Sequence, residues 1–359
     1  MEPIKEALTF DDVLLLPQYS SIVPSNTNLT LNISKSIRLK LPFISSAMDT
    51  VTESRMAIAM AKNGGMGIIH RNLEIQQQVN EIKKVKKYNL NVGAAIGTSK
   101  KELIRAKRLI DCGTSMLVID TAHGHSKNVI NILNKIKKFS KNISICVGNI
   151  ATSEAAKILY DSGADILKVG IGPGSICTTR MVAGIGVPQI TAILNVKKAM
   201  RKKNIKIISD GGIKFSGDII KAIAAGADAI MMGSIFAGTE ESPGKKFKLK
   251  NKYYKLYRGM GSIGAMSSGS SERYFQKNYK DKSKFVPEGV ESRVVYKGSV
   301  KNIIYQLQGG LRSSMGYIGA QKLSDIQKKS KFIKITKAGF YESMVHSVEA
   351  LKNTPNFKL

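Results

Sequence analysis

Residues 143–170 read ISICVGNIATSEAAKILYDSGADILKVG and contain one complete structural unit. An apolar run, 143–148, is followed by an amphipathic segment, 153–161, then by Gly163 and a second apolar run, 166–170. This order predicts a strand, a helix that ends at a glycine, and a second strand parallel to the first.

The same alternation extends in both directions along the chain. Further amphipathic segments lie at 101–110, 127–139, 193–201 and 215–225. Counting the two runs above, eight apolar runs occur, at 41–45, 67–70, 92–97, 116–120, 143–148, 166–170, 205–210 and 229–233. Strands that are apolar throughout are buried on both faces, as in a parallel sheet. We therefore predict a closed parallel (β/α)8 TIM barrel, whose active site lies at the carboxyl ends of the strands.

The rest of the chain adds one unusual segment to this barrel. Residues 253–293 are rich in glycine, serine and charge, which is typical either of a functional lid or of a disordered segment. Helical patterns return at 300–309 and 322–329, and no linker is evident, so we expect one domain over 1–359.

Composition limits the possible partners and the location. The formal net charge of +30 arises from lysines spread over helix faces, so we expect no specific nucleic-acid binding. No apolar stretch reaches the ~18 residues of a membrane span. The first residues lack a basic region followed by an apolar one, and a cytoplasmic protein is expected.

The most specific chemical feature is the loop from Gly170 to Arg180, which contains Cys177. Glycines at 170, 172 and 174 allow main-chain groups to approach a ligand closely. A thiol in such a loop at a strand end is a candidate nucleophile, against the alternative of an incidental cysteine. The other cysteines, Cys112 and Cys146, lie in apolar surroundings and are interpreted as buried structural thiols.

Two further loops indicate a phosphate site. Asp210-Gly211-Gly212 ends the seventh run, and Gly233-Ser234 ends the eighth, where barrels often bind phosphate. Asp210 is either a ribose ligand or a cap for the helix that starts near Phe215. His123 and His125 are interpreted as loop polarity, because zinc needs three or four protein ligands.

Taken together, these motifs resemble the inosine-5′-monophosphate dehydrogenase family over nearly the whole chain. The matching segments are 8–15, 45–53, 120–126, 147–152, 170–180, 257–262, 271–276 and 287–291. The resemblance implies that Cys177 adds to C2 of inosine monophosphate (IMP), that hydride passes to NAD⁺, and that the thioimidate is hydrolysed to xanthosine monophosphate. This reaction is the first committed step of guanine nucleotide synthesis.

The resemblance also implies ligand contacts. The nucleotide would be held by Ser46, Asn149, Ser175, Asp210, Gly211, Gly212, Gly233, Ser234, Tyr257, Arg258, Gly259, Met260, Gly261 and Glu288. The dinucleotide would meet Asp120, Gly170, Ile171 and Gly172. A potassium ion would bind carbonyls of Gly172, Gly174 and Cys177 and, from a neighbouring subunit of a homotetramer, those of Glu342, Ser343 and Met344.

In the family, residues 253–293 correspond to a mobile flap. The flap enters the dinucleotide site after NADH leaves and brings Arg273 and Tyr274 to the hydrolytic water. In the family, Arg273 is assigned as the base that activates this water. A guanidinium is normally protonated, however, and so accepts a proton poorly. Two alternatives follow: Thr179 is the base, or Arg273 only positions the water.

The chain departs from the family pattern between the second and third strands. Most members insert a pair of regulatory cystathionine-β-synthase-type modules there, whereas residues 71–91 suffice for one helix. We expect control by purine nucleotides through these modules to be lost.

A second interpretation of the function is the related guanosine monophosphate reductase. Those enzymes have a glutamate shortly after Gly-Met, where this chain reads Gly259-Met260-Gly261-Ser262-Ile263, and this difference favours the dehydrogenase. A non-catalytic basic barrel is a third, less favoured interpretation.

Overall fold

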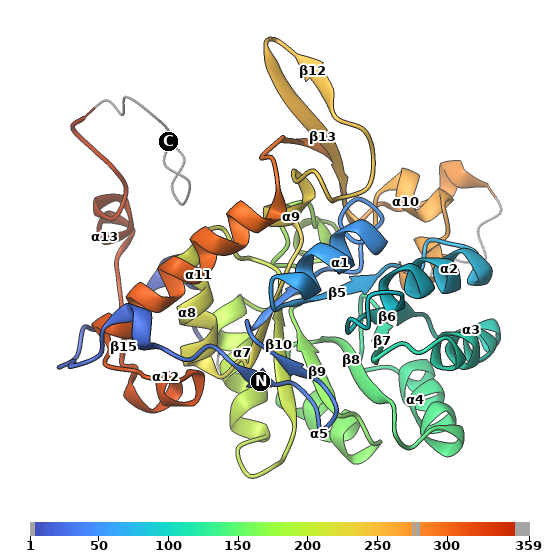
Figure 1. Ribbon diagram of the computed structural model, residues 1–359, viewed down its shortest axis with the longest axis horizontal. Helices are drawn as coiled ribbons and strands as arrows, with labels where there is room; N and C mark the ends of the chain where they lie inside the picture. Colours follow the sequence, from blue (N-terminus) through green and yellow to red (C-terminus); the bar gives the residue numbers. More distant parts are fainter. Residues whose placement is uncertain (1–3, 275, 277–280, 349–359) are drawn as a thin grey trace.

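The computed structural model describes residues 4–274, 276 and 281–348. Its centre is a closed barrel of eight parallel strands in the order β10-β11-β4-β5-β6-β7-β8-β9, which confirms the predicted TIM barrel (Figure 1). The strands are β4 (Phe43–Ser45), β5 (Met66–Ile69), β6 (Gly93–Ile96), β7 (Met116–Asp120), β8 (Ser144–Ile150), β9 (Ile166–Val169), β10 (Lys206–Asp210) and β11 (Ala229–Met232). Each overlaps one of the predicted apolar runs.

Strand pairing closes the barrel. The last strand, β11, pairs with the first, β4, through Met232 and Ser45, and β9 pairs with β10 through Val169 and Ser209. Seven of the eight strands are buried at every residue, because barrel side chains on one face and helices on the other exclude water.

Amphipathic helices surround the barrel. In α4, Val129, Ile132, Leu133 and Ile136 recur at helical spacing and are all buried against the strands. The ring consists of α1 (Ser54–Lys62), α2 (Ile75–Lys86), α3 (Lys100–Asp111), α4 (Lys127–Phe139), α5 (Ser153–Asp161), α7 (Gln189–Ala199), α8 (Ser216–Ala225) and α11 (Val300–Tyr317). Within the described ranges, none of the helices has the length and apolar character needed to cross a membrane.

Two helices differ from their predicted extents. Helix α7 begins at Gln189, directly after Pro188, and not at 193. Helix α11 continues past the predicted end at Gly309, because Gly310 is used for close packing. A Cβ at Gly310 would lie 2.2 Å from the Ser216 hydroxyl oxygen, so glycine lets α11 approach α8 and does not end the helix.

Short elements flank the barrel. Strand β1 (Val13–Leu15) pairs antiparallel with β15 (Phe332–Lys334). The remaining elements outside the barrel and the lid region are η1 (Phe10–Asp12), η2 (Pro24–Asn26), β2 (Leu31–Asn32), β3 (Arg38–Leu39), α6 (Thr179–Val182), α9 (Ser234–Ala237), α12 (Leu323–Lys329) and α13 (Lys337–Glu342).

The 253–293 segment is more regular than its sequence suggests. Strands β12 (Phe247–Leu249), β13 (Lys252–Arg258) and β14 (Glu291–Val295) form an antiparallel sheet that projects from the barrel (Figure 1). The strand pattern was missed because one buried position of β13 is a lysine: Lys255 is 2% exposed and donates to the Thr239 carbonyl at 3.0 Å.

Between β13 and β14 lie α10 (Ile263–Ser267), η3 (Ser270–Tyr274) and η4 (Lys282–Lys284). Part of the predicted flap lies outside the described residues, namely 275 and 277–280. Position 275 is Phe275 of the 271–276 motif.

Candidate active site

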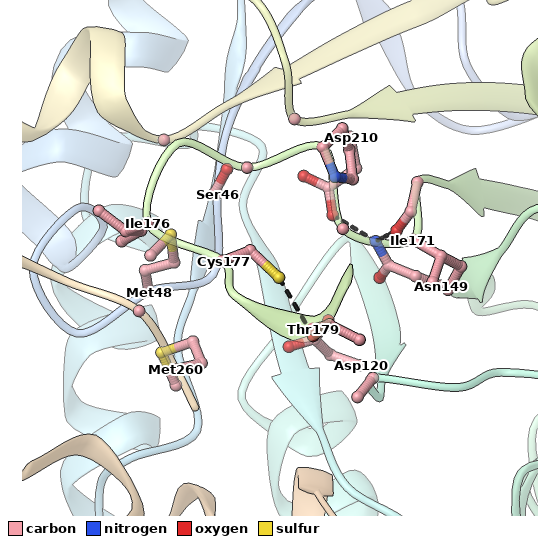
Figure 2. A pocket seen from close by; sticks show the side chains of 18 of the residues that line it. Ser46, Met48, Asp120, Asn149, Ile171, Ile176, Cys177, Thr179, Asp210 and Met260 are labelled. Carbon is pink, nitrogen blue, oxygen red and sulfur yellow. Dashed lines mark hydrogen bonds between the residues drawn. The ribbon is translucent and has the colours of Figure 1, made fainter. Parts of the chain in front are cut away.

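A cavity of about 140 Å³ opens at the carboxyl ends of the barrel strands. One wall is formed by loops that follow β4 and β7 to β11, and the other by residues of 257–274 and Glu288. Figure 2 shows Cys177 pointing into the space between these walls, with Asp120, Asn149 and Asp210 beside it.

The loop that carries Cys177 depends on its glycines. A Cβ at Gly170 would lie 2.2 Å from the Asp210 carbonyl oxygen, so only glycine allows this loop to pass the end of β10. Gly172 has a φ of +77°, in the left-handed region that disfavours other residues. At the end of the loop, the half-buried Cys177 thiol donates to the Thr179 hydroxyl oxygen at 3.2 Å (Figure 2).

The opposite wall holds this loop through main-chain hydrogen bonds. The Thr178 amide donates to the Glu288 carbonyl at 2.9 Å, and the Val290 amide donates to the Ile176 carbonyl at 3.0 Å. A Cβ at Gly259 would lie 3.0 Å from that same Ile176 carbonyl oxygen. The absence of a side chain at Gly259 therefore lets three main-chain segments meet beside Cys177.

A fully buried lysine, which the sequence analysis did not single out, lies under the cavity. Lys168, on β9, donates from Nζ to Asp120 Oδ1 at 3.0 Å and to Asp210 Oδ2 at 2.9 Å, and also contacts Asn149 Oδ1. Burial opposes the charge of Lys168, but the two carboxylates raise its pKa above the ordinary value. The signal in the sequence was a single lysine inside the apolar run Ile166–Val169.

Asp120 bridges Lys168 and Arg273. Burial alone would raise the pKa of Asp120, but the two cations lower it well below the usual range. Arg273 Nη1 contacts Asp120 Oδ2, and the Ala122 amide donates to the Arg273 carbonyl at 3.4 Å. Burial works against the charge of Arg273, yet Asp120 raises its pKa, so Arg273 is a guanidinium cation in this arrangement.

The contacts of Asp210 decide between its two sequence interpretations. Its Oδ2 accepts from Asn149 Nδ2 at 2.9 Å and from Lys168 (Figure 2). The amides of Lys214 and Phe215 at the start of α8 are instead capped by Asp218. Asp210 therefore faces the cavity and does not cap the helix.

Comparisons with known proteins agree with this geometry. Residues 7–346 match the family model described as IMP dehydrogenase / GMP reductase domain. The chain belongs to this family. It is 48% identical to an inosine-5′-monophosphate dehydrogenase of Cryptosporidium parvum over 397 aligned residues, with 99% of this chain and 98% of the relative covered.

Two bacterial relatives carry the same name. The protein of Borreliella burgdorferi is 48% identical over 394 residues, with 96% of this chain and 98% of the relative covered. That of Aquifex aeolicus is 40% identical over 483 aligned positions, with 99% and 98% covered. Since 483 positions exceed the 359 residues of this chain, the Aquifex relative contains residues that this family member lacks.

Most residues that the family resemblance singled out line the cavity. All four catalytic candidates do so: Cys177, Thr179, Arg273 and Tyr274. So do the dinucleotide candidates Asp120, Gly170, Ile171 and Gly172, and Gly174 from the predicted potassium loop. The nucleotide candidates in the lining are Ser46, Asn149, Asp210, Gly211, Gly233, Tyr257, Gly259, Met260 and Glu288. Met48, Met231 and Ile176 also line the cavity and were not predicted.

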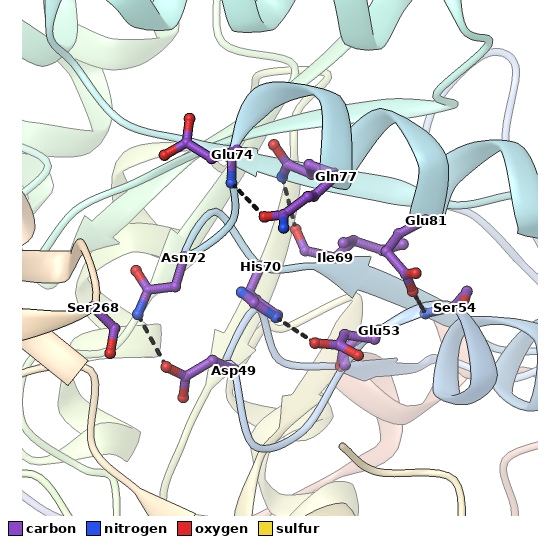
Figure 3. A network of polar contacts seen from close by, with 12 residues as sticks. Asp49, Glu53, Ser54, Ile69, His70, Asn72, Glu74, Gln77, Glu81 and Ser268 are labelled. Carbon is purple, nitrogen blue, oxygen red and sulfur yellow. Dashed lines mark hydrogen bonds and ion pairs between the residues drawn. The ribbon is translucent and has the colours of Figure 1, made fainter. Parts of the chain in front are cut away.

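The other nucleotide candidates lie outside the cavity lining. They are Ser175, Gly212, Ser234, Arg258 and Gly261. Arg258 pairs with Asp49 at 2.7 Å, next to the contact of Asp49 with Asn72 that Figure 3 shows. In this structure Arg258 therefore ties the wall to the loop after β4.

The remaining candidates lie away from the cavity. Glu342 and Ser343 are exposed at the end of α13, which packs against η1 on the side of the molecule opposite α10 (Figure 1). Together with Met344 they are absent from the lining of the cavity.

One of the two cysteines predicted to be buried structural thiols is buried. Cys146 is fully buried, which raises its pKa to about 12. Cys112 is only half-buried, because it lies at the end of α3, and its thiol donates to the Leu109 carbonyl at 3.2 Å. Among the described residues, no cluster of three or more His, Cys, Asp or Glu side chains could hold a metal ion.

Proposed function

We propose that this chain oxidises IMP to xanthosine monophosphate with NAD⁺ as the oxidant. The observation that carries the proposal is the position of the Cys177 thiol in a cavity at the strand ends. The thiol is hydrogen-bonded to the Thr179 hydroxyl, and Arg273 and Tyr274 line the opposite wall. The relatives named inosine-5′-monophosphate dehydrogenase support the choice of substrate.

The nucleotide would lie across the cavity floor. Gly211 and Gly233 follow β10 and β11 and line the cavity, at the strand ends where barrels often bind phosphate. Asp210, which lines the cavity, would accept hydrogen bonds from ribose hydroxyls. The main chain of Gly259 and Met260 and the Glu288 region would contact the base, beside Cys177.

The chemistry then follows from the position of the thiol. Cys177 loses its proton and its sulfur bonds to C2 of IMP, and the hydrogen on C2 leaves as hydride. NAD⁺, when bound, accepts that hydride. Water next adds to C2, the carbon–sulfur bond breaks, and the cysteine recovers its proton as xanthosine monophosphate leaves.

The residues expected to hold the dinucleotide are suited to it. Gly170 and Gly172 present main chain without side chains, and Asp120 offers a buried carboxylate to ribose hydroxyls. In this structure Asp120 is engaged by Arg273. The dinucleotide and Arg273 would therefore compete for one carboxylate, which supports a flap over 253–293 that alternates with the cofactor.

The charge of Arg273 bears on the hydrolytic step. As a guanidinium it donates hydrogen bonds and so orients a water, but it accepts no proton while Asp120 stabilises its charge. We therefore favour Arg273 as the residue that positions the water. Thr179, which is hydrogen-bonded to the Cys177 thiol, is the better candidate for accepting the proton of that water.

A monovalent cation and a tetramer complete the proposal. Gly172, Gly174 and Cys177 share one loop, and carbonyl oxygens are ligands that suit potassium. Glu342, Ser343 and Met344 do not line the cavity beside this loop in their own chain, which is compatible with a contribution to the loop of a neighbouring subunit.

Control through the inserted modules is not expected. Residues 71–91 contain one described helix, α2, between β5 and β6. We propose that catalysis proceeds without them. Adding ATP or GTP should leave turnover unchanged at saturating substrate, and a saturable allosteric response would contradict this.

The deciding experiment supplies IMP, NAD⁺ and potassium and follows NADH absorbance, with guanosine monophosphate and NADPH in a parallel reaction. We expect turnover only in the first mixture, and a lower rate when potassium is replaced by a bulky organic cation. Turnover only in the second mixture would make the chain a reductase. Sedimentation at the assay concentration tests the tetramer.

A further inference from the structure

The residue before Arg273 makes its own contact with the barrel. Glu272 Oε1 accepts hydrogen bonds from the main-chain amides of Thr98 at 3.0 Å and Ser99 at 2.7 Å. These amides lie in the loop between β6 and α3. A side chain of η3 is thus bound to a barrel loop that is more than 170 residues away in sequence.

The surroundings favour a carboxylate at this point. Ser99 is the N-cap of α3, which is 12 residues long, so the amides lie at the positive end of a helix. The buried guanidinium of Arg71 is close by: a Cβ on Gly97 would lie 2.7 Å from Arg71 Nη1 and 3.1 Å from Glu272 Oε1. A side chain at position 97 would displace the Arg71 guanidinium, so Gly97 leaves room for these two charged groups at the same place.

Glu272 and Arg273 therefore hold two successive barrel loops. Glu272 binds the loop after β6, and Arg273 binds Asp120 at the end of β7 and the Ala122 amide beyond it. The loop after β5 makes a further contact, because Asn72 Nδ2 donates to Asp49 and lies 3.4 Å from the Ala265 carbonyl of α10 (Figure 3).

We propose that Glu272 is a positioning residue that holds the flap closed, and so keeps Arg273 and Tyr274 at Cys177 during hydrolysis. This inference rests on the proposed function. Glu272 does not line the cavity, so it acts through its neighbour and does not touch substrate. Its loss should slow the hydrolytic half-reaction and leave hydride transfer unchanged.

The chain offers a matched pair of variants on the barrel side of the contact. Ser99 has a φ of −72°, which proline adopts, so Ser99→Pro removes the amide donor while the Glu272 carboxylate stays. The Ser99 hydroxyl has no hydrogen-bond partner among the described residues, so Ser99→Ala keeps the amide and is the control. Glu272→Ala removes the acceptor, and Glu272→Gln keeps an acceptor without the charge.

The experiment compares the pre-steady-state burst of NADH with steady-state turnover. We expect Glu272→Ala and Ser99→Pro each to lower kcat on the order of ten-fold, with the burst rate unchanged, because a charge-assisted hydrogen bond is lost. The double variant should be no slower than the worse single one, and Glu272→Gln should lie between Glu272→Ala and the unchanged protein.

Three results would overturn the inference: an unchanged kcat in Glu272→Ala, an equal fall of burst and turnover in that variant, or additive effects in the double variant. Thermal unfolding of every variant separates a folding defect from an open flap. If the unaltered protein produces no NADH from IMP, the proposed function itself fails, and that outcome is distinct from a normal burst with insensitive turnover.

Discussion

The two walls of the cavity are held by different forces. In the barrel wall, Lys168 joins Asp120 and Asp210 by ion pairs at the ends of strands that are buried along most of their length. In the opposite wall, main-chain hydrogen bonds of Glu288 and Val290 to the Cys177 loop and the contacts of residues 270–274 provide the attachment. The first wall is part of the core, whereas the second is attached to it by a small set of hydrogen bonds and the Arg273–Asp120 ion pair, and under the proposed function it separates when these contacts break. This division matches a reaction with one step before the wall closes and one after it.

The largest effect is expected at the meeting point of the walls. Cys177→Ala removes the nucleophile, so both half-reactions and the NADH burst should be lost, with turnover down by at least roughly 10³-fold. The side chain is small and half-buried, so the thermal unfolding temperature should hardly change. Stopped-flow absorbance measures the burst, and differential scanning calorimetry measures the unfolding temperature. A persisting burst would exclude Cys177 as the nucleophile.

A stability test addresses the barrel wall alone. Lys168→Met leaves Asp210 without its cation and the buried Asp120 with Arg273 alone, so the free energy of unfolding should fall by about 3–5 kcal/mol. Urea denaturation measures this loss. Lys206→Met is the control, since Lys206 also pairs with an aspartate but is partly exposed, and should cost less than ~1 kcal/mol. Equal losses in the two variants would show that the buried cluster is not what stabilises the barrel wall.

The opposite wall should respond in activity and hardly in stability. Arg273→Ala should retain a burst of NADH while steady-state turnover falls by roughly 10²-fold, because the water loses its orienting cation. Rapid mixing separates the two phases. Loss of the burst would show that Arg273 is needed before hydride leaves, and the separation of the two walls by reaction step would then be wrong.

Acid should weaken the barrel wall through Asp120. The pKa of Asp120 is lowered in the folded state, so its stabilisation is complete above its unfolded pKa of about 3.9 and is lost as the pH falls through the folded value. Between about pH 5 and pH 2 the free energy of unfolding of the unaltered protein should fall by on the order of 1 kcal/mol more than that of Asp120→Asn. Parallel acid titrations of unfolding would reveal this difference, and identical curves would refute it.

The smallest effect concerns the main-chain crossing of the two walls. In Gly259→Ala the new methyl group would lie 3.0 Å from the Ile176 carbonyl, so the segments must shift by a few tenths of an ångström. We expect KM for IMP to rise by roughly five- to tenfold, which corresponds to about 1 kcal/mol. Gly217→Ala is the control, because nothing lies within 4 Å of a Cβ there.

Sequence patterns were sufficient where one physical rule controlled the structure. The eight strands were found because burial on both faces demands continuous apolar runs, and the Cys177 loop because its glycines are close together in sequence. Arg273 and Tyr274 were placed by resemblance, and their contacts across the barrel follow no local pattern. Lys168 was missed because its two carboxylates lie 48 and 42 residues away, and a lone lysine in a strand does not reveal such partners.

The β13 strand and the length of α11 were missed for a related reason. Lys255 occupies a buried position that an apolar residue would normally fill, because its ammonium reaches main-chain carbonyls. Gly310 is a residue type that often ends a helix, but here it leaves space for the Ser216 side chain at the contact of α11 with α8. In both cases the partner of the residue, and not the residue type, decides the structure.

The buried Lys168 also has a consequence for how the barrel assembles during synthesis. Its partner Asp120 precedes it in the chain, but Asp210 is made only after the following helix, α7. Until β10 is in place, closing the growing sheet would enclose a cation with half of its compensating charge missing. Partly assembled barrels are therefore disfavoured, and the nascent chain is driven toward a single cooperative closure once β10 and then β11, which pairs with β4, have emerged.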